Sequence, residues 1–103
     1  MRGYRGFDKN GKGWVYGDLI HNQKVTVTGL EPRVMVGGYE VFPESVGQDT
    51  GGRDIHGDSI YEGDIVRFTR KGTVCTAIVE YRDYAYSIRG CKDIEIMGKT
   101  WKE

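Results

Sequence analysis

The chain has 103 residues, enough for one modest domain and too few for two independent domains of ordinary size. Its 15 Lys and Arg residues balance its 15 Asp and Glu residues, so the chain as a whole has no cationic field that would attract a polyphosphate. With 16 Gly, 7 Tyr, 3 Phe and 2 Trp, it favours short twisted strands and tight turns over long helices.

The first predicted element is a β-hairpin over residues 4–16. Strand-prone aromatic runs flank the segment "DKNGKG", in which Asn10 and Gly11 form the dipeptide that a two-residue type I′ turn prefers. This end of the chain is mildly basic, which fits either a local nucleic-acid contact or an ordinary solvated surface. Its charged residues are Arg2, Arg5, Lys9, Lys12 and Lys24, against Asp8 and Asp18.

Alternating patterns predict the next strands. Val25 and Val27 alternate with polar residues, which predicts a half-buried strand that ends at Gly29. The segment "RVMVGGYEVF" predicts two further strands separated by a Gly-Gly break. Pro43 then suits the first position of one short helical turn.

The second half begins with a polar, glycine-punctuated segment. We expect a connecting loop at residues 47–63, between an N-terminal β region at residues 1–46 and a C-terminal part at residues 64–103 of one domain. Several short strands at close spacing predict a small curled sheet or barrel and a mostly β fold with minor helix. The strand-like segments of this part are residues 64–69, 73–81, 84–88 and 94–97.

Neither of the two candidate calcium loops has the carboxylate ligand that its last position requires. A calcium loop that begins at Asp8 has Leu19 at its twelfth position, where a bidentate carboxylate is needed, and one that begins at Asp54 has Ile65 there. We therefore predict no metal site and no cofactor.

The two cysteines, Cys75 and Cys91, have no zinc-ligand spacing to each other or to His21 and His56. They are typical of reduced thiols in an intracellular protein. No apolar run approaches the roughly 18 residues that cross a bilayer. We expect no membrane contact and a cytoplasmic location.

The segment "GGRDIHGDSIYEGDIVRF", residues 51–68, concentrates acidic residues, glycines and a histidine. Asp54, His56, Asp58 and Ser59 could be imagined as hydrolytic groups, but neighbours on an extended chain alternate in direction. Gly57 and Gly63 permit positive φ, and Asp58 and Asp64 can hydrogen-bond backbone amides a residue or two onward. We predict turn formers with no catalytic role, and a protein that is not an enzyme.

A candidate binding surface comes from basic and aromatic residues of the C-terminal part. Aromatics interleaved with arginines can stack nucleobases and contact phosphates, or the rings can instead cover the core while their hydroxyls face water. The candidate residues are Arg67, Arg70, Lys71, Tyr81, Arg82, Tyr84, Tyr86 and Arg89.

The stretch "VGQDTGGRDIHGDSIYEGDIV", residues 46–66, resembles the signature segment of the YopX family of phage and prophage proteins. The opening "YRGFDKNGKGWVYGDL" and the ending "CKDIEIMGKTWKE" are similar to those of the family, so the resemblance spans nearly the whole chain. The chain departs from the family at Asp49, where Tyr is usual, at Gly52, where Leu is usual, and at Ser59, where a charged residue is common. The resemblance implies a two-part, mostly β fold with an SH3-like C-terminal barrel, a phage setting and self-association, and it implies no reaction.

Two functions remain open from the sequence. The first is a small non-catalytic binding protein of a phage or prophage that acts in the host cytoplasm as a counter-defence factor. Its partner would be a host immune protein or a small nucleotide signal, and copies would form a homo-oligomer. The alternative is a nucleic-acid-binding accessory protein, in which Arg67, Arg70 and Lys71 contact phosphates and Tyr84 or Tyr86 stacks on bases.

Overall fold

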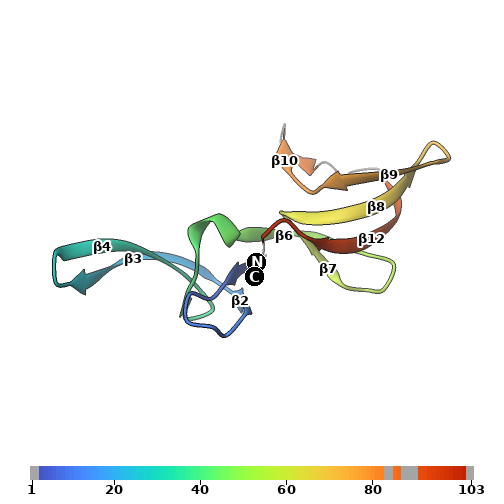
Figure 1. Ribbon diagram of the computed structural model, residues 1–103. Coiled ribbons are helices and arrows are strands. Elements are labelled where there is room, and N and C mark those ends of the chain that lie inside the picture. The colour runs from blue at the N-terminus through green and yellow to red at the C-terminus, as the bar shows by residue number, and fades with distance from the viewer. Residues whose placement is uncertain (1–2, 83–84, 87–90, 102–103) are drawn as a thin grey trace. The chain divides into compact units, whose positions relative to one another are not determined.

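The computed structural model describes residues 3–82, 85–86 and 91–101, which form antiparallel strands and one short 3-10 helix (Figure 1). The expected mostly β class is confirmed. The elements are β1 (Tyr4–Phe7), β2 (Trp14–Gly17), β3 (Leu19–Thr26), β4 (Gly29–Val36), β5 (Tyr39–Glu40), η1 (Pro43–Ser45), β6 (Gly47–Arg53), β7 (Ser59–Tyr61), β8 (Asp64–Arg70), β9 (Thr73–Ile78), β10 (Tyr81–Arg82), β11 (Ala85–Tyr86) and β12 (Lys92–Lys99).

The chain divides into two compact units, which we call unit 1, containing Gly3–Gln48, and unit 2, which begins at Asp49. The connection expected at residues 47–63 contains two strands, β6 and β7. The first residues of β6 pair with β1 in unit 1, and its later residues pair with β7 in unit 2. Glycine-rich polar strands of this length lack the apolar alternation that signals a strand, which explains why the sequence suggested a loop.

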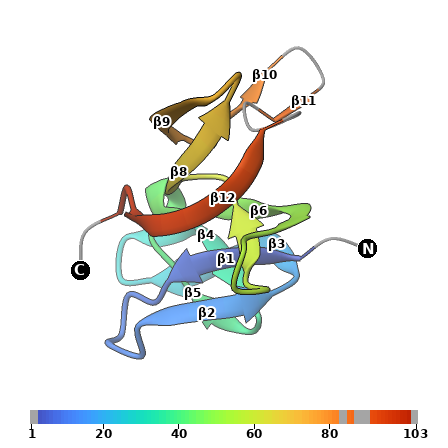
Figure 2. The ribbon, with the colours of Figure 1, turned by 90° about the vertical axis from the view of Figure 1, so that its right-hand side faces the viewer.

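The predicted hairpin of unit 1 is confirmed, because β1 and β2 pair from Tyr4 opposite Gly17 to Phe7 opposite Trp14 (Figure 2). The predicted type I′ turn is wrong. Asn10 does not take the positive φ that this turn requires, whereas Gly11 and Gly13 do. A longer turn results because the Asp8 carboxylate accepts a hydrogen bond from the Lys12 amide at 2.9 Å.

The core of unit 1 is small and contains Val15, Val36 and Val41. Gly37 allows the chain to reverse between β4 and β5 with a φ of 60°, so the predicted Gly-Gly break is confirmed. The predicted helical turn after it is the 3-10 helix η1. The Ser45 hydroxyl at its end accepts a hydrogen bond from the Phe7 amide at 2.7 Å and so ties this turn to β1.

A long two-stranded arm forms most of the remainder of unit 1 (Figure 1). Its strands, β3 and β4, pair continuously from Leu19 opposite Val36 to Thr26 opposite Gly29. The prediction of a half-buried strand that ends at Gly29 is wrong. Val25 and Val27 are exposed, and the strand ends at Thr26. Val27 lies in the turn after β3, and within unit 1 the third strand of this sheet, β5, pairs only with Met35 and Val36, at the far end from the arm tip.

Unit 2 is built on an antiparallel sheet in which β8 lies between β9 and β12 (Figure 2). The strand expected at residues 73–81 ends at Ile78, and β10 then pairs with β11. The inner face of the sheet packs a core of Ile60, Val66, Phe68 and Val79.

Within the described ranges, no helix is long and apolar enough to span a membrane.

Candidate functional site

The turn between β6 and β7 is organised by Asp54, which is almost fully buried. One of its carboxylate oxygens accepts hydrogen bonds from the backbone amides of His56 at 2.9 Å and Asp58 at 3.0 Å. Its other oxygen accepts one from the Ile96 amide of β12 at 3.4 Å, and the Ile55 amide donates to the Ile94 carbonyl at 2.9 Å. The turn is thereby fastened to β12.

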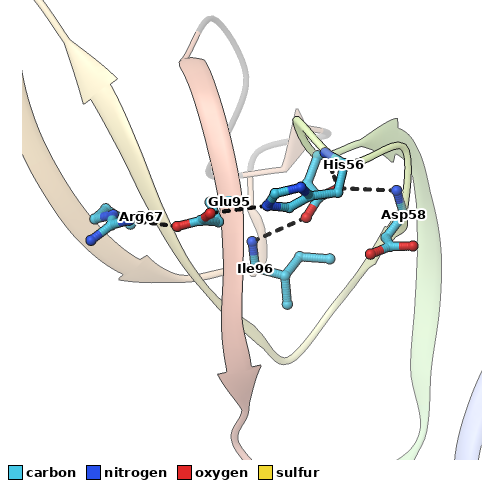
Figure 3. Close-up of polar contacts among 6 residues, drawn as sticks. His56, Asp58, Arg67, Glu95 and Ile96 are labelled. Atoms are coloured by element: carbon cyan, nitrogen blue, oxygen red, sulfur yellow. Dashed lines mark hydrogen bonds and ion pairs between the residues drawn. The ribbon is translucent and has the colours of Figure 1, made fainter.

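A row of charged side chains crosses from this turn to the sheet (Figure 3). His56 Nε2 lies 3.0 Å from Glu95 Oε2 on β12, and the other Glu95 oxygen accepts a short hydrogen bond from Arg67 on β8. Arg67 and Glu95 are direct cross-strand partners in the sheet register, which explains their contact. We call these three residues the charged row.

The electrostatics of the turn and the charged row are consistent with this geometry. Burial alone would raise the pKa of Asp54, but backbone hydrogen bonds from Asp58, Ile96 and His56 outweigh it and lower that pKa. The hydrogen bond to Glu95 raises the pKa of His56, and the bond to His56, together with Arg67, lowers the pKa of Glu95. Each ionised form is favoured by its neighbours, as in a structural ion network.

The residues considered as hydrolytic groups therefore have structural partners. Asp54 supports the turn, His56 pairs with Glu95, and Asp58 contributes its backbone amide to Asp54. The carboxylate that holds this turn is that of Asp54, whereas the sequence suggested Asp58. In the part of the chain that the structure describes, no three His, Cys, Asp or Glu side chains gather where they could hold a metal ion.

The next turn of the same segment is held by Asp64, which is fully buried. Its Oδ2 accepts a hydrogen bond from the Tyr61 amide at 2.8 Å, and Gly63 takes a φ of 94° between them. Gly57 likewise has a φ of 85° in the preceding turn. The prediction that these residues are turn formers is confirmed.

The candidate binding residues of unit 2 are only partly brought together. Arg67 and Arg70 lie on opposite faces of β8, since Arg70 packs over the ring of Phe68 on the core face while Arg67 is exposed beside Glu95. Lys71 occupies the turn after β8 with a φ of 50°. Of the other candidate residues, Tyr81 and Arg82 form β10 and Tyr86 belongs to β11, whereas Tyr84 and Arg89 lie outside the described residues.

Both cysteines are free thiols, and the Arg70 guanidinium donates to Cys91 Sγ at 3.2 Å.

Glu95 is the residue of the charged row that the sequence did not suggest. It lies far from His56 and Arg67 along the chain, and no local motif marks a carboxylate that two distant cations share.

Comparison with models of protein families matches residues 3–103 to the family described as YopX protein. No curated protein matches the sequence. The match covers essentially the whole chain and confirms the resemblance found in the sequence.

Proposed function

Because the chain belongs to the YopX protein family, we propose that it is a small binding protein without catalytic activity, encoded by a bacteriophage or prophage and acting in the host cytoplasm. The observation that carries this proposal is the β3–β4 arm. Its tip presents Val25, Val27 and Leu30, which are 84%, 106% and 64% exposed. Val25 and Leu30 are cross-strand partners, and adjacent exposed apolar side chains of this kind are typical of a surface that contacts another protein.

Polar contacts between its strands support the arm. Arg33 Nε donates to Asn22 Oδ1 at 2.8 Å, and Thr26 Oγ1 donates to the Gly29 carbonyl at 3.0 Å. A two-stranded hairpin is marginally stable in water, and β5 pairs only with the last two residues of β4. An ordered arm with an uncovered apolar tip would gain stability from a partner at a small ordering cost.

The specific form that we propose is counter-defence. The protein would occlude a host immune protein or sequester a small nucleotide signal, and either role needs a binding surface and no reaction. We also propose that copies of the chain associate, because a second arm tip would offer the same kind of apolar surface.

The test compares the wild type with an arm variant, Val25→Ser, Val27→Ser and Leu30→Ser. Val74→Ser with Ile78→Ser is the control, since those exposed aliphatic residues lie on β9 of unit 2. Light scattering measures self-association, pull-down from bacterial lysate measures capture of a host protein, and a ligand screen measures nucleotide binding. We expect the arm variant to lose association or capture while the control keeps it. A wild type that binds neither itself, a host protein nor a nucleotide would overturn the proposal.

The second candidate is a nucleic-acid-binding accessory protein. The arginines suggested by the sequence support it weakly, because Arg67 and Arg70 lie on opposite faces of β8 and do not form one surface. A group of lysines in unit 1 favours it more directly. No binding of single- or double-stranded DNA or RNA at low salt would eliminate it.

A further inference from the structure

Three lysines of unit 1 gather around one short segment. Lys9 and Lys12 belong to the turn between β1 and β2, and this turn lies against the β5 segment because the Lys9 amide donates to the Glu40 carbonyl at 2.9 Å. Lys24 comes from the arm and reaches the same place, where its ammonium group contacts both Glu40 carboxylate oxygens, at 3.0 and 3.2 Å.

Positive charge exceeds negative charge at this place. The Lys9 ammonium group also contacts Glu40, at 3.4 Å, so one carboxylate serves two lysines. Lys12 brings a third cation and Asp8, whose carboxylate accepts a hydrogen bond from the Lys12 amide, brings a second carboxylate, so three ammonium groups face two carboxylates. The hydrogen bond from Lys24 is the main reason that the pKa of Glu40 is lowered, with Lys9 contributing in the same direction. Glu31 stands opposite Lys24 in the arm register, and Arg33 follows it on the same face, so these two further charges cancel.

Two aromatic rings hold these cations in place. The Lys12 ammonium group lies 5.3 Å from the centroid of the Tyr39 ring, and that of Lys9 lies 5.7 Å from the centroid of the Phe42 ring. Lysine side chains normally lose much conformational freedom when they bind an anion. Because these lysines are already positioned by rings and by a carboxylate, that cost is reduced.

We propose that this lysine–aromatic surface, formed by Lys9, Lys12, Lys24, Tyr39 and Phe42, binds the phosphodiester backbone of single-stranded nucleic acid. The inference rests on the second candidate function and gives it a site in unit 1 in place of the arginines of unit 2. Ammonium groups gathered along one short segment can contact successive phosphates of a backbone. Tyr39, which is 40% exposed, adds aromatic surface on which a nucleobase can stack and an acidic peptide side chain cannot.

The experiment measures binding of a labelled oligothymidylate by fluorescence anisotropy. The unit 1 variant carries Lys9→Gln, Lys12→Gln and Lys24→Gln, and its control in unit 2 carries Arg67→Gln, Arg70→Gln and Lys71→Gln, which removes the same charge. We expect the wild type and the control to bind and the unit 1 variant to bind at least about tenfold more weakly, because it has lost its phosphate contacts. For three contacts, wild-type affinity should fall about 20-fold between about 50 and 200 mM salt.

A single substitution, Lys12→Glu, repeats the test with little risk to folding, because the Lys12 side chain is exposed and its turn is held by its backbone amide. It should also weaken binding, and circular dichroism checks that each variant is folded. If the wild type binds and only the unit 2 control loses binding, the site is overturned while the nucleic-acid function stands. If the wild type does not bind at low salt, that function falls with the site. Equally tight binding of polyglutamate would overturn the proposal in favour of an acidic protein partner.

Discussion

Replacing Asp64 by alanine removes a carboxylate that is 1% exposed and supports the turn between β7 and β8. Its Oδ2 accepts a hydrogen bond from the Tyr61 amide at 2.8 Å. The Asp64 carbonyl accepts a hydrogen bond from the Val79 amide at 2.8 Å, and this backbone contact does not depend on the side chain. The substitution therefore isolates what the side chain contributes to the turn.

A hydrogen bond to a charged acceptor contributes about 1.5–3 kcal/mol, and the amide left without it adds about 1 kcal/mol. We therefore expect Asp64→Ala to lower the free energy of unfolding of unit 2 by about 2.5–4 kcal/mol. Asp64→Asn has the same shape, and its carbonyl oxygen can still accept from the Tyr61 amide, so about 1–2 kcal/mol should be lost. Asp64→Ala should therefore be less stable than Asp64→Asn, because only asparagine keeps an acceptor for the Tyr61 amide.

Urea unfolding followed by tryptophan fluorescence measures this loss. Trp14 lies in unit 1 and Trp101 in unit 2, so a Trp14→Phe background makes the signal report on unit 2. Asp58→Ala is the matched control, because the Asp58 side chain is exposed and its backbone makes the contacts with Asp54. The reasoning is refuted if Asp64→Ala is as stable as Asp58→Ala.

Two further predictions concern single residues. Because the pKa of His56 is raised, its pairing with Glu95 contributes fully to folding stability below pH 6.5, and this contribution is lost as the pH rises through the raised value. An NMR titration should show that Glu95→Gln lowers the pKa of His56, and an unchanged pKa would contradict the pairing. Gly37→Ala should destabilise unit 1 by about 1–3 kcal/mol in chemical denaturation, because φ is 60° and the new Cβ would overlap the Tyr16 carbonyl oxygen. Gly38→Ala, with nothing within 4 Å of its Cβ, should cost less, and an equal loss would show that close approach is not the cause.

Local patterns were sufficient to predict many of the strands. The hairpin of β1 and β2, the Gly37 reversal and the turn at Pro43 each depend on residues that are neighbours in sequence, so their chemistry is visible there. Burial was less predictable. Alternation at Val25 and Val27 predicted an apolar strand face, but it contains no information about whether another element covers that face, and Val27 lies in the turn after β3.

The contacts of the candidate sites could not be predicted. Asp54 and Ile96, or His56 and Glu95, meet only after the sheet of unit 2 has formed, and nothing in the intervening sequence indicates that register. The same holds for Lys24 and Glu40 in unit 1. The basic residues near the start of the chain were visible, but their convergence on a single carboxylate depends on the fold.

The attachment of the turn at Asp54 to β12 has a consequence for solubility. The free edge of a sheet offers unpaired amides and carbonyls that can recruit a strand from another molecule and start aggregation. Here the Ile94 carbonyl and the Ile96 amide of β12 are already occupied, by the Ile55 amide and the Asp54 carboxylate. The segment rich in acidic residues and glycines thus shields one edge of its own sheet, and a variant that frees this edge should aggregate before it loses its fold.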